Sequence, residues 1–269
     1  MAAQEILVEN SRGMFSENLI WGAIPVGYQK LTDSQGNRLA VRADHQQEIL
    51  FSTCLEIENR GDVAGIFGRG DMHAVKLADG TTALFRRYHH GGLFRSLTGE
   101  WFYSWPPRPF RELSITEELR RRGFPTVEVL AAFVEKIGGP VYRGWLVSRQ
   151  LEGAQDLWAG LQNGFSECVG IEALLKAVAA VIRRMHREGI YHRDLNLKNI
   201  LVRSSAVGVE SYVIDFDKAI LGLGQLPAPL AQKNLGRLLR SIRKLDPQRH
   251  YFSAASWDGF LEYYHAAVA

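Results

Sequence analysis

The hydrophobic residues change their period near residue 150, and this change divides the chain into two parts. Before it, short alternating segments predict four strands, Met72–Leu77, Thr81–Tyr88, Val127–Ile137 and Val141–Ser148. Asp79-Gly80 is a typical hairpin turn between the first two strands. A helix over Phe110–Arg122 is predicted between the two strand pairs, because Leu113 and Leu119 share one face.

After residue 150 the apolar residues follow a helical period. One face collects Ile171, Leu174, Leu175, Val178, Ile182 and Met185. This spacing predicts an amphipathic helix that ends at Gly189. Short strands are predicted at Ile200–Arg203 and Tyr212–Ile214, and helices at Ala231–Leu245 and Trp257–Ala267.

These patterns predict an α+β chain with three segments. Residues 61–150 form a small antiparallel sheet with one helix, and residues 151–269 form a compact, mainly helical part. Residues 1–60 show no readable pattern, and we interpret them as an N-terminal extension.

Composition limits the classes of protein that need to be considered. Hydrophobic residues make up 46% of the 269, which is ample for a large core. No window approaches the roughly 18 consecutive apolar residues of a membrane span, and the acidic N-terminus differs from a signal peptide. We therefore expect a cytoplasmic protein. Cys54 and Cys168 are the only cysteines, which argues against a zinc site or a disulfide framework. A net charge of +3 does not indicate a nucleic-acid partner.

The segments Tyr191–Val202 and Val213–Asp217 carry the most specific chemistry. They place Asp194, Asn199 and Asp215 in order, five and then sixteen residues apart. Phosphoryl transfer needs such groups, a carboxylate that faces the attacking hydroxyl and an amide and carboxylate that hold Mg²⁺. The spacing matches the motif H-R-D-L-x-x-x-N followed by D-F-G. Three ordinary loop residues are the alternative.

With these segments, the chain resembles the bacterial lipopolysaccharide kinase family (Kdo kinase and heptose kinase type) of the protein-kinase-like superfamily. Kdo is 3-deoxy-D-manno-octulosonic acid. The matching segments are Gly68-Arg69-Gly70, Leu84–Tyr88, Gly91-Gly92, Phe110-Arg111-Glu112, His192–Leu201, Ile214–Ala219 and Asn234–Ser241. The resemblance implies a bilobed protein-kinase-like fold, with an N-lobe over residues 61–150, a C-lobe over residues 151–269 and ATP between them.

The resemblance also implies roles for individual residues. Asp194 accepts or orients the proton of a sugar hydroxyl, and Asn199 and Asp215 hold Mg²⁺. Lys198 stabilises the γ-phosphate, with a solvated surface lysine as the alternative. His192 braces the metal-binding segment and is structural.

A second group of residues is expected to bind the nucleotide. Arg86, on the second strand of the hairpin, anchors the phosphates and pairs with Glu112 on the following helix. Lys76 resembles the lysine of a V-A-I-K motif but falls on the first strand. Gly68 and Gly70 cover the phosphates, or else only punctuate a turn.

The expected acceptor is a sugar. No Ser, Thr or Tyr lies between Asp217 and Arg240, so the segment lacks a site for activation by phosphorylation. The resemblance implies ATP- and Mg²⁺-dependent phosphorylation of Kdo in the lipopolysaccharide inner core (a Kdo-lipid A precursor), at the cytoplasmic face of the inner membrane. A heptose kinase, a small atypical protein kinase and a nucleotide-binding pseudokinase remain alternatives.

The stretch Lys233–Arg249 contains six Lys or Arg residues and one Asp, interleaved with leucine and isoleucine. Such a helix can lie peripherally on anionic lipid or bind an acidic sugar. A core-facing helix with a solvated basic face is the alternative.

Overall fold

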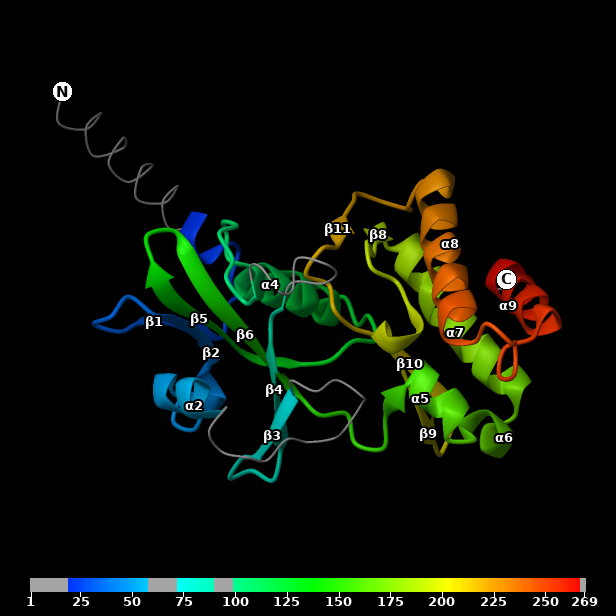
Figure 1. Ribbon diagram of the computed structural model, residues 1–269, viewed down its shortest axis with the longest axis horizontal. Helices are drawn as coiled ribbons and strands as arrows, with labels where there is room; N and C mark the ends of the chain where they lie inside the picture. The colour runs from blue at the N-terminus through cyan, green and yellow to red at the C-terminus, as the bar shows by residue number, and fades with distance from the viewer. Residues whose placement is uncertain (1–18, 58–71, 90–98, 267–269) are drawn as a thin grey trace. The chain divides into compact units, whose positions relative to one another are not determined.

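The computed structural model describes residues 19–57, 72–89 and 99–266 (Figure 1). The chain divides into two compact units, each described separately below. The first comprises Met1–Glu118 and Glu128–Gln150, and the second comprises Leu119–Val127 and Leu151–Ala269.

The first unit is built on a six-stranded antiparallel sheet. In spatial order its strands are β1 (Tyr28–Thr32), β2 (Arg38–Arg42), β5 (Val129–Gly138), β6 (Val141–Arg149), β4 (Thr82–Arg87) and β3 (Met72–Lys76). The helical elements around it are η1 (Ala43–His45), α2 (Phe51–Glu56) and α4 (Arg108–Arg121). The four strands and the helix predicted between residues 72 and 148 are all present.

The N-terminal region differs from the prediction. We expected residues 1–60 to form an extension, but β1 and β2 belong to the sheet, where β2 pairs with β5. Residues 58–60 and 1–18 lie outside the described part of the chain. The pattern is hard to recognise because β1 is a mostly exposed edge strand, and β2 has three consecutive buried residues instead of an alternation.

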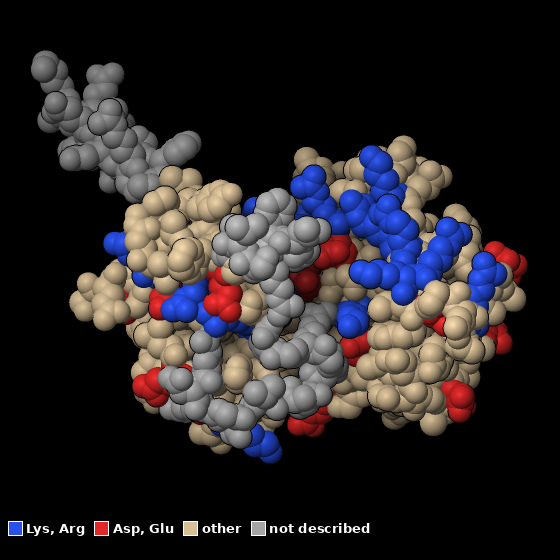
Figure 2. All heavy atoms as spheres, in the orientation of Figure 1, with Lys and Arg blue, Asp and Glu red and all other residues tan. Residues whose placement is uncertain are grey.

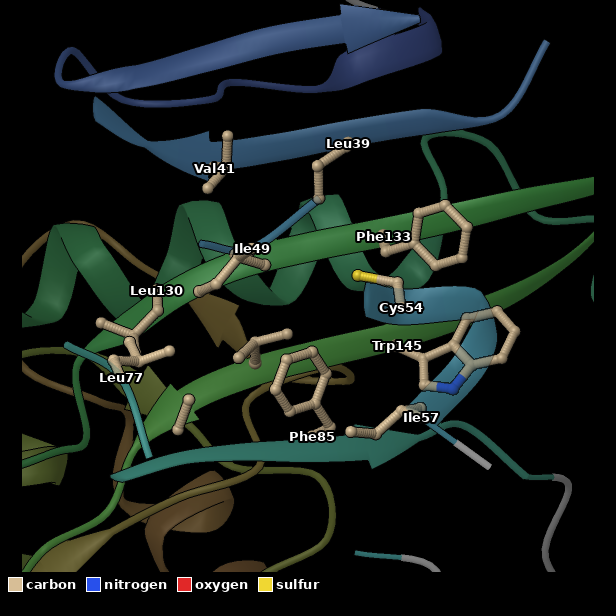
Figure 3. Close-up of a cluster of buried hydrophobic side chains, with 13 residues drawn as sticks. Leu39, Val41, Ile49, Cys54, Ile57, Leu77, Phe85, Leu130, Phe133 and Trp145 are labelled. Atoms are coloured by element: carbon tan, nitrogen blue, oxygen red, sulfur yellow. The ribbon is translucent and has the colours of Figure 1, made fainter. Parts of the chain in front are cut away.

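Alternate residues of the central strands enter two different hydrophobic cores. Leu39, Phe133 and Trp145 belong to the core that contains Cys54 of α2 (Figure 3). Their neighbours, such as Ala132 on β5, belong to a second core that contains Phe110 and Leu113 of α4. Successive side chains of a strand point to opposite faces of its sheet, so the sheet is covered on both faces. This explains why the first six residues of β5 are all buried.

The second unit is mainly helical. Its helices are α5 (Leu157–Gln162), α6 (Phe165–Val169), α7 (Ile171–Arg187), η4 (Leu197–Asn199), α8 (Ala228–Leu245) and α9 (Ala254–Ala266). Two small antiparallel sheets accompany them. One contains β7 (Gln155–Asp156), β9 (Ile200–Ser205) and β10 (Gly208–Val213), and the other contains β8 (Ile190–Tyr191) and β11 (Ile220–Leu221). No helix in the described ranges has the length and apolar character needed to cross a membrane.

The amphipathic helix α7 forms as predicted and carries the core of this unit. It ends at Arg187, two residues before the predicted end at Gly189. The φ of Gly189 is 74°, which suits glycine, and a Cβ atom there would collide with the carbonyl oxygen of Gly224. On the other side, Arg183 of α7 donates hydrogen bonds to the carbonyl oxygens of Tyr264 and His265. The C-terminal turn of α9 is therefore attached to α7.

In the first unit, β6 packs closely against α4 at Gly144. We therefore predict that one added methyl group at this position destabilises the protein. A Cβ atom at Gly144 would lie 2.5 Å from Cγ of Pro109. We expect Gly144→Ala to lower the free energy of unfolding by about 1–3 kcal/mol, as for other overpacked sites. Urea titration would measure this change. The matched control is Gly138→Ala, where no neighbouring atom lies within 4 Å. Equal stability of the two variants would contradict the close contact.

Candidate active site

The segment between β8 and β9 carries the predicted catalytic residues and has little regular structure of its own. It turns after β8, passes Asp194 and enters the single turn of η4. Asn196 caps this turn, because its side chain accepts a hydrogen bond from the backbone N–H of Lys198 at 2.9 Å. In this segment, side chains therefore bond to backbone groups that would pair with other backbone groups in a helix or a strand.

Hydrogen bonds hold the peptide groups on both sides of Asp194. Its N–H donates to Nδ1 of His192 at 3.2 Å. Its carbonyl oxygen accepts from the side-chain amides of Asn196 and Asn199, each at 2.9 Å. The backbone of Asp194 is thus fixed while the residue itself is exposed. A carboxylate held in this way is accessible to a substrate.

His192 joins this loop to the Val213–Asp217 segment. Its Nε2 donates to the carbonyl oxygen of Ile214 at 2.9 Å, and the N–H of Ile214 donates to the carbonyl oxygen of Asn199 at 3.0 Å. With Nδ1 accepting and Nε2 donating, the ring is neutral and both nitrogens are occupied. These bonds bring Asp194, Asn199 and Asp215 to one site. They also link His192 to the Val213–Asp217 segment, which is the contact that a bracing role requires.

Asp215 has a φ of 71°, in the left-handed region. Residues other than glycine seldom adopt this conformation, although Asp and Asn do so more often than most, and such residues cluster at functional sites. The surrounding bonds to Ile214 and the burial of Phe216 hold this backbone in place.

Helix α8 supports the loop through polar side chains that sequence reasoning did not assign. Asn234 donates to the carbonyl oxygen of His192 at 2.8 Å and accepts from its N–H at 3.3 Å. Ser241 accepts from the N–H of Leu197 at 3.2 Å, and Arg237 donates to the hydroxyl of Tyr191 at 2.8 Å. Asn234 is completely buried. A polar residue on the same face of α8 as Leu238 and Ile242 was the signal available in the sequence.

A buried histidine of α7, His186, connects Asn234 of α8 to α9 by hydrogen bonds. Nε2 of His186 lies 3.1 Å from the side chain of Asn234, and its Nδ1 lies 2.8 Å from the hydroxyl of Tyr264. Burial lowers the pKa of His186 to about 4. The imidazole is therefore neutral, with Nε2 as a donor to Asn234 and Nδ1 as an acceptor from Tyr264.

In the first unit, the predicted pair Arg86 and Glu112 forms an ion pair. Nη2 of Arg86 lies 2.7 Å from both carboxylate oxygens of Glu112, and the carboxylate is almost completely buried. The hydroxyl of Tyr88 donates to the same carboxylate, and the Arg86 guanidinium lies 4.9 Å from the Tyr88 ring centroid. Lys76 lies on β3 and is exposed, as its position before the hairpin turn indicated.

Two other residues of the catalytic segments differ in burial. Lys198 is half-buried on η4, beside Asn199. Asp217, which takes the place of the glycine in D-F-G, is buried. Gly68 and Gly70 lie outside the described residues, so their role remains a prediction.

Comparison with solved structures identifies the class of fold. A structure described as "WaaP in complex with acyl carrier protein" matches 88% of this chain and 89% of its own, with a TM-score of 0.51 and 17% identity. At this identity the match shows the fold alone. The chain thus has the α+β, protein-kinase-like fold.

Comparison of sequences identifies the family. The model of the lipopolysaccharide kinase (Kdo/WaaP) family matches residues 61–264. A 3-deoxy-D-manno-octulosonic acid kinase from Mannheimia succiniciproducens is 31% identical over 226 residues, which is 81% of this chain and 90% of that protein. One from Vibrio vulnificus is 36% identical over 185 residues, 68% of this chain and 73% of that protein. The chain belongs to the lipopolysaccharide kinase (Kdo/WaaP) family.

The buried His186 predicts a loss of stability in acid. Its pKa is about 4 in the folded protein and 6.5 ordinarily, so between these values the unfolded chain binds a proton that the folded chain does not. The free energy of unfolding therefore falls as the pH drops from 6.5 to 4, by up to about 3 kcal/mol from this group. Urea titrations at several pH values in this range give the free energy of unfolding at each pH. This free energy should depend less on pH in His186→Gln than in the wild type. The exposed His250→Gln is the control, and equal slopes for the wild type and His186→Gln would contradict the prediction.

Proposed function

We propose that the chain transfers the γ-phosphate of ATP to a hydroxyl group of Kdo in the lipopolysaccharide inner core, on a Kdo-lipid A precursor. The observation that carries the proposal is the set of hydrogen bonds from His192 and Asn199 that joins the Asp194 loop to the Asp215 segment. Relatives named 3-deoxy-D-manno-octulosonic acid kinase, similar over most of their length, support Kdo as the sugar. As a kinase of this family, the protein uses ATP.

In this reaction Asp194 receives the acceptor hydroxyl. The hydroxyl oxygen attacks the γ-phosphorus, the bond between that phosphorus and the bridging oxygen of ADP breaks, and the hydroxyl proton passes to Asp194. The transition state is loose, so positioning contributes more than basicity. The bonds to both peptide groups of Asp194 supply that positioning. Lys198, four residues later, stabilises the charge of the transferring phosphoryl group.

Asn199 and Asp215 have the donor chemistry of a magnesium site. Mg²⁺ prefers oxygen ligands and is usually bound by one or two carboxylates together with substrate phosphates. Nδ2 of Asn199 donates to Asp194 O, so the orientation of this amide is set. When bound, Mg²⁺ would neutralise phosphate charge, while Asn199 and Asp215 hold it.

Arg86, Gly68 and Gly70 bind the nucleotide phosphates in this proposal. Arg86 presents a planar guanidinium that matches phosphate oxygens, and Glu112 holds it in place from α4. Tyr88 restricts the pair further, because it contacts both partners.

We place the protein at the cytoplasmic face of the inner membrane, held peripherally. A lipid-linked acceptor lies at that surface.

The role of Asp194 is tested by Asp194→Asn. We expect kcat to fall by about 10²–10⁴, as for loss of a general base, while the affinity for ATP stays within about twofold because the residue faces the acceptor. Transfer of labelled phosphate to a Kdo-lipid A precursor measures kcat. The matched control is Asp258→Asn, which changes an exposed carboxylate on α9. Near-normal kcat in Asp194→Asn would exclude this role.

The same assay with a panel of acceptors tests the substrate. Label is expected in Kdo-lipid A precursor. Label only in heptosylated core would indicate a heptose kinase, and label only in peptides would indicate a protein kinase. ATP binding without transfer to any acceptor would indicate a pseudokinase.

The metal role of Asp215 predicts a specific change in nucleotide affinity. Asp215→Asn should abolish the increase in ATP affinity that Mg²⁺ produces in the wild type, because the amide is a neutral and weaker ligand. Titration of ATP by calorimetry with and without Mg²⁺ measures this difference. An Mg²⁺ effect of wild-type size in the variant would remove Asp215 from the metal site.

A further inference from the structure

Helix α8 carries an unusual concentration of positive charge on its outer face. It contains no Asp or Glu between Ala228 and Leu245. Figure 2 shows Lys and Arg side chains gathered over this helix. Its exposed basic residues, named here the α8 basic face, are Lys233, Arg240, Arg243 and Lys244.

The α8 basic face differs in its ion pairing from other basic residues of the second unit. Arg184 pairs with Glu188 at 2.7 Å, and Arg203 pairs with Glu210 at 2.7 Å. No residue of the α8 basic face forms an ion pair with any carboxylate in the described part of the chain. Like charges three and four residues apart destabilise a helix. The arrangement is therefore suited to an anionic ligand.

The contacts on the opposite side of α8 limit the groups that this helix can offer to a ligand. Leu238 and Ile242 are buried within the unit, so the helix has no apolar face left to insert into a bilayer. Asn234 and Ser241, also on the inner side, hold the catalytic loop. The α8 basic face thus offers charge alone, on a rigid support beside the loop that carries Asp194.

We infer that the α8 basic face binds the carboxylate and phosphate groups of the glycolipid acceptor and holds it beside the catalytic loop. This inference rests on the proposed function. Kdo is an acid and a lipid A precursor carries phosphates, so the acceptor presents several negative charges. The guanidinium groups of Arg240 and Arg243 match such groups bidentately.

The length of the face favours an extended acceptor over a single sugar. Lys233 and Lys244 are eleven residues apart, which corresponds to about 16 Å along a helix. A free Kdo molecule is too small to reach all four side chains. The lipid-linked acceptor should therefore depend on the α8 basic face more strongly than free Kdo does.

The test compares two variants that each lose three positive charges. One is Arg240→Gln, Arg243→Gln and Lys244→Gln, and the control carries Lys30→Gln, Lys76→Gln and Lys136→Gln on exposed positions of the first unit. We expect the α8 variant to raise KM for the lipid-linked acceptor at least tenfold at low salt. The values of kcat and of KM for ATP should be unchanged, and the control should behave as wild type. Circular dichroism would establish that both variants fold.

The dependence of KM on ionic strength provides an independent test. KM of the wild type for the lipid-linked acceptor should rise with ionic strength, whereas KM of the α8 variant should be nearly constant. This arm uses wild-type protein and remains decisive if the triple variant does not fold. An unchanged KM in the α8 variant, an equal rise in the control, or a wild-type KM independent of salt would overturn the inference.

A further outcome separates acceptor binding from membrane binding. If the α8 variant loses sedimentation with anionic vesicles that lack acceptor but keeps a normal KM in detergent, the face binds membrane lipid and the inference is wrong. Failure of the proposed function is distinguishable from both, because wild-type protein would then not phosphorylate Kdo at all.

Discussion

One buried amide holds the active-site loop. Asn234 bonds to both the N–H and the carbonyl oxygen of His192, so a single side chain satisfies two backbone groups that no helix or strand satisfies. From His192, hydrogen bonds lead to the N–H of Asp194 and to the carbonyl of Ile214. The relative positions of the predicted base and the predicted metal ligands therefore depend on Asn234. Because the amide is buried, unpaired groups left by its loss would have no water to replace it.

The two sides of helix α8 have different roles, one toward the loop and one toward solvent. Its inner side carries neutral polar groups that bond to the loop, and its outer side carries basic residues that form no ion pair within the described ranges. Amphipathic periodicity makes both compatible, because residues three and four apart share a face. Arg237 lies between the two sides, where it contacts the Tyr191 ring and its hydroxyl.

Much of the fold could be predicted from the sequence because its signals are local. The strands flanking Asp79-Gly80, the helix α7 and the order of the catalytic residues all follow from short-range periodicity or spacing. The edge strand β1 and the short strand β2 could not be predicted, because only their pairing within the sheet reveals them. Asn234 bonds to His192, 42 positions away, and Tyr264 bonds to His186, 78 positions away. A local sequence pattern cannot predict contacts between residues so far apart in the chain. The catalytic roles themselves remain predictions.

The attachment of α9 to α7 has a practical consequence for engineering. The carbonyl oxygens of Tyr264 and His265 bind Arg183, and the hydroxyl of Tyr264 binds His186, which in turn reaches Asn234. The last turn of α9 is thus three side chains away from the loop that carries Asp194. Truncations before residue 266, or rigid fusions joined directly to that turn, would disturb the support of the active site even though they change none of its residues. A purification tag at this end needs a flexible linker that leaves the turn intact.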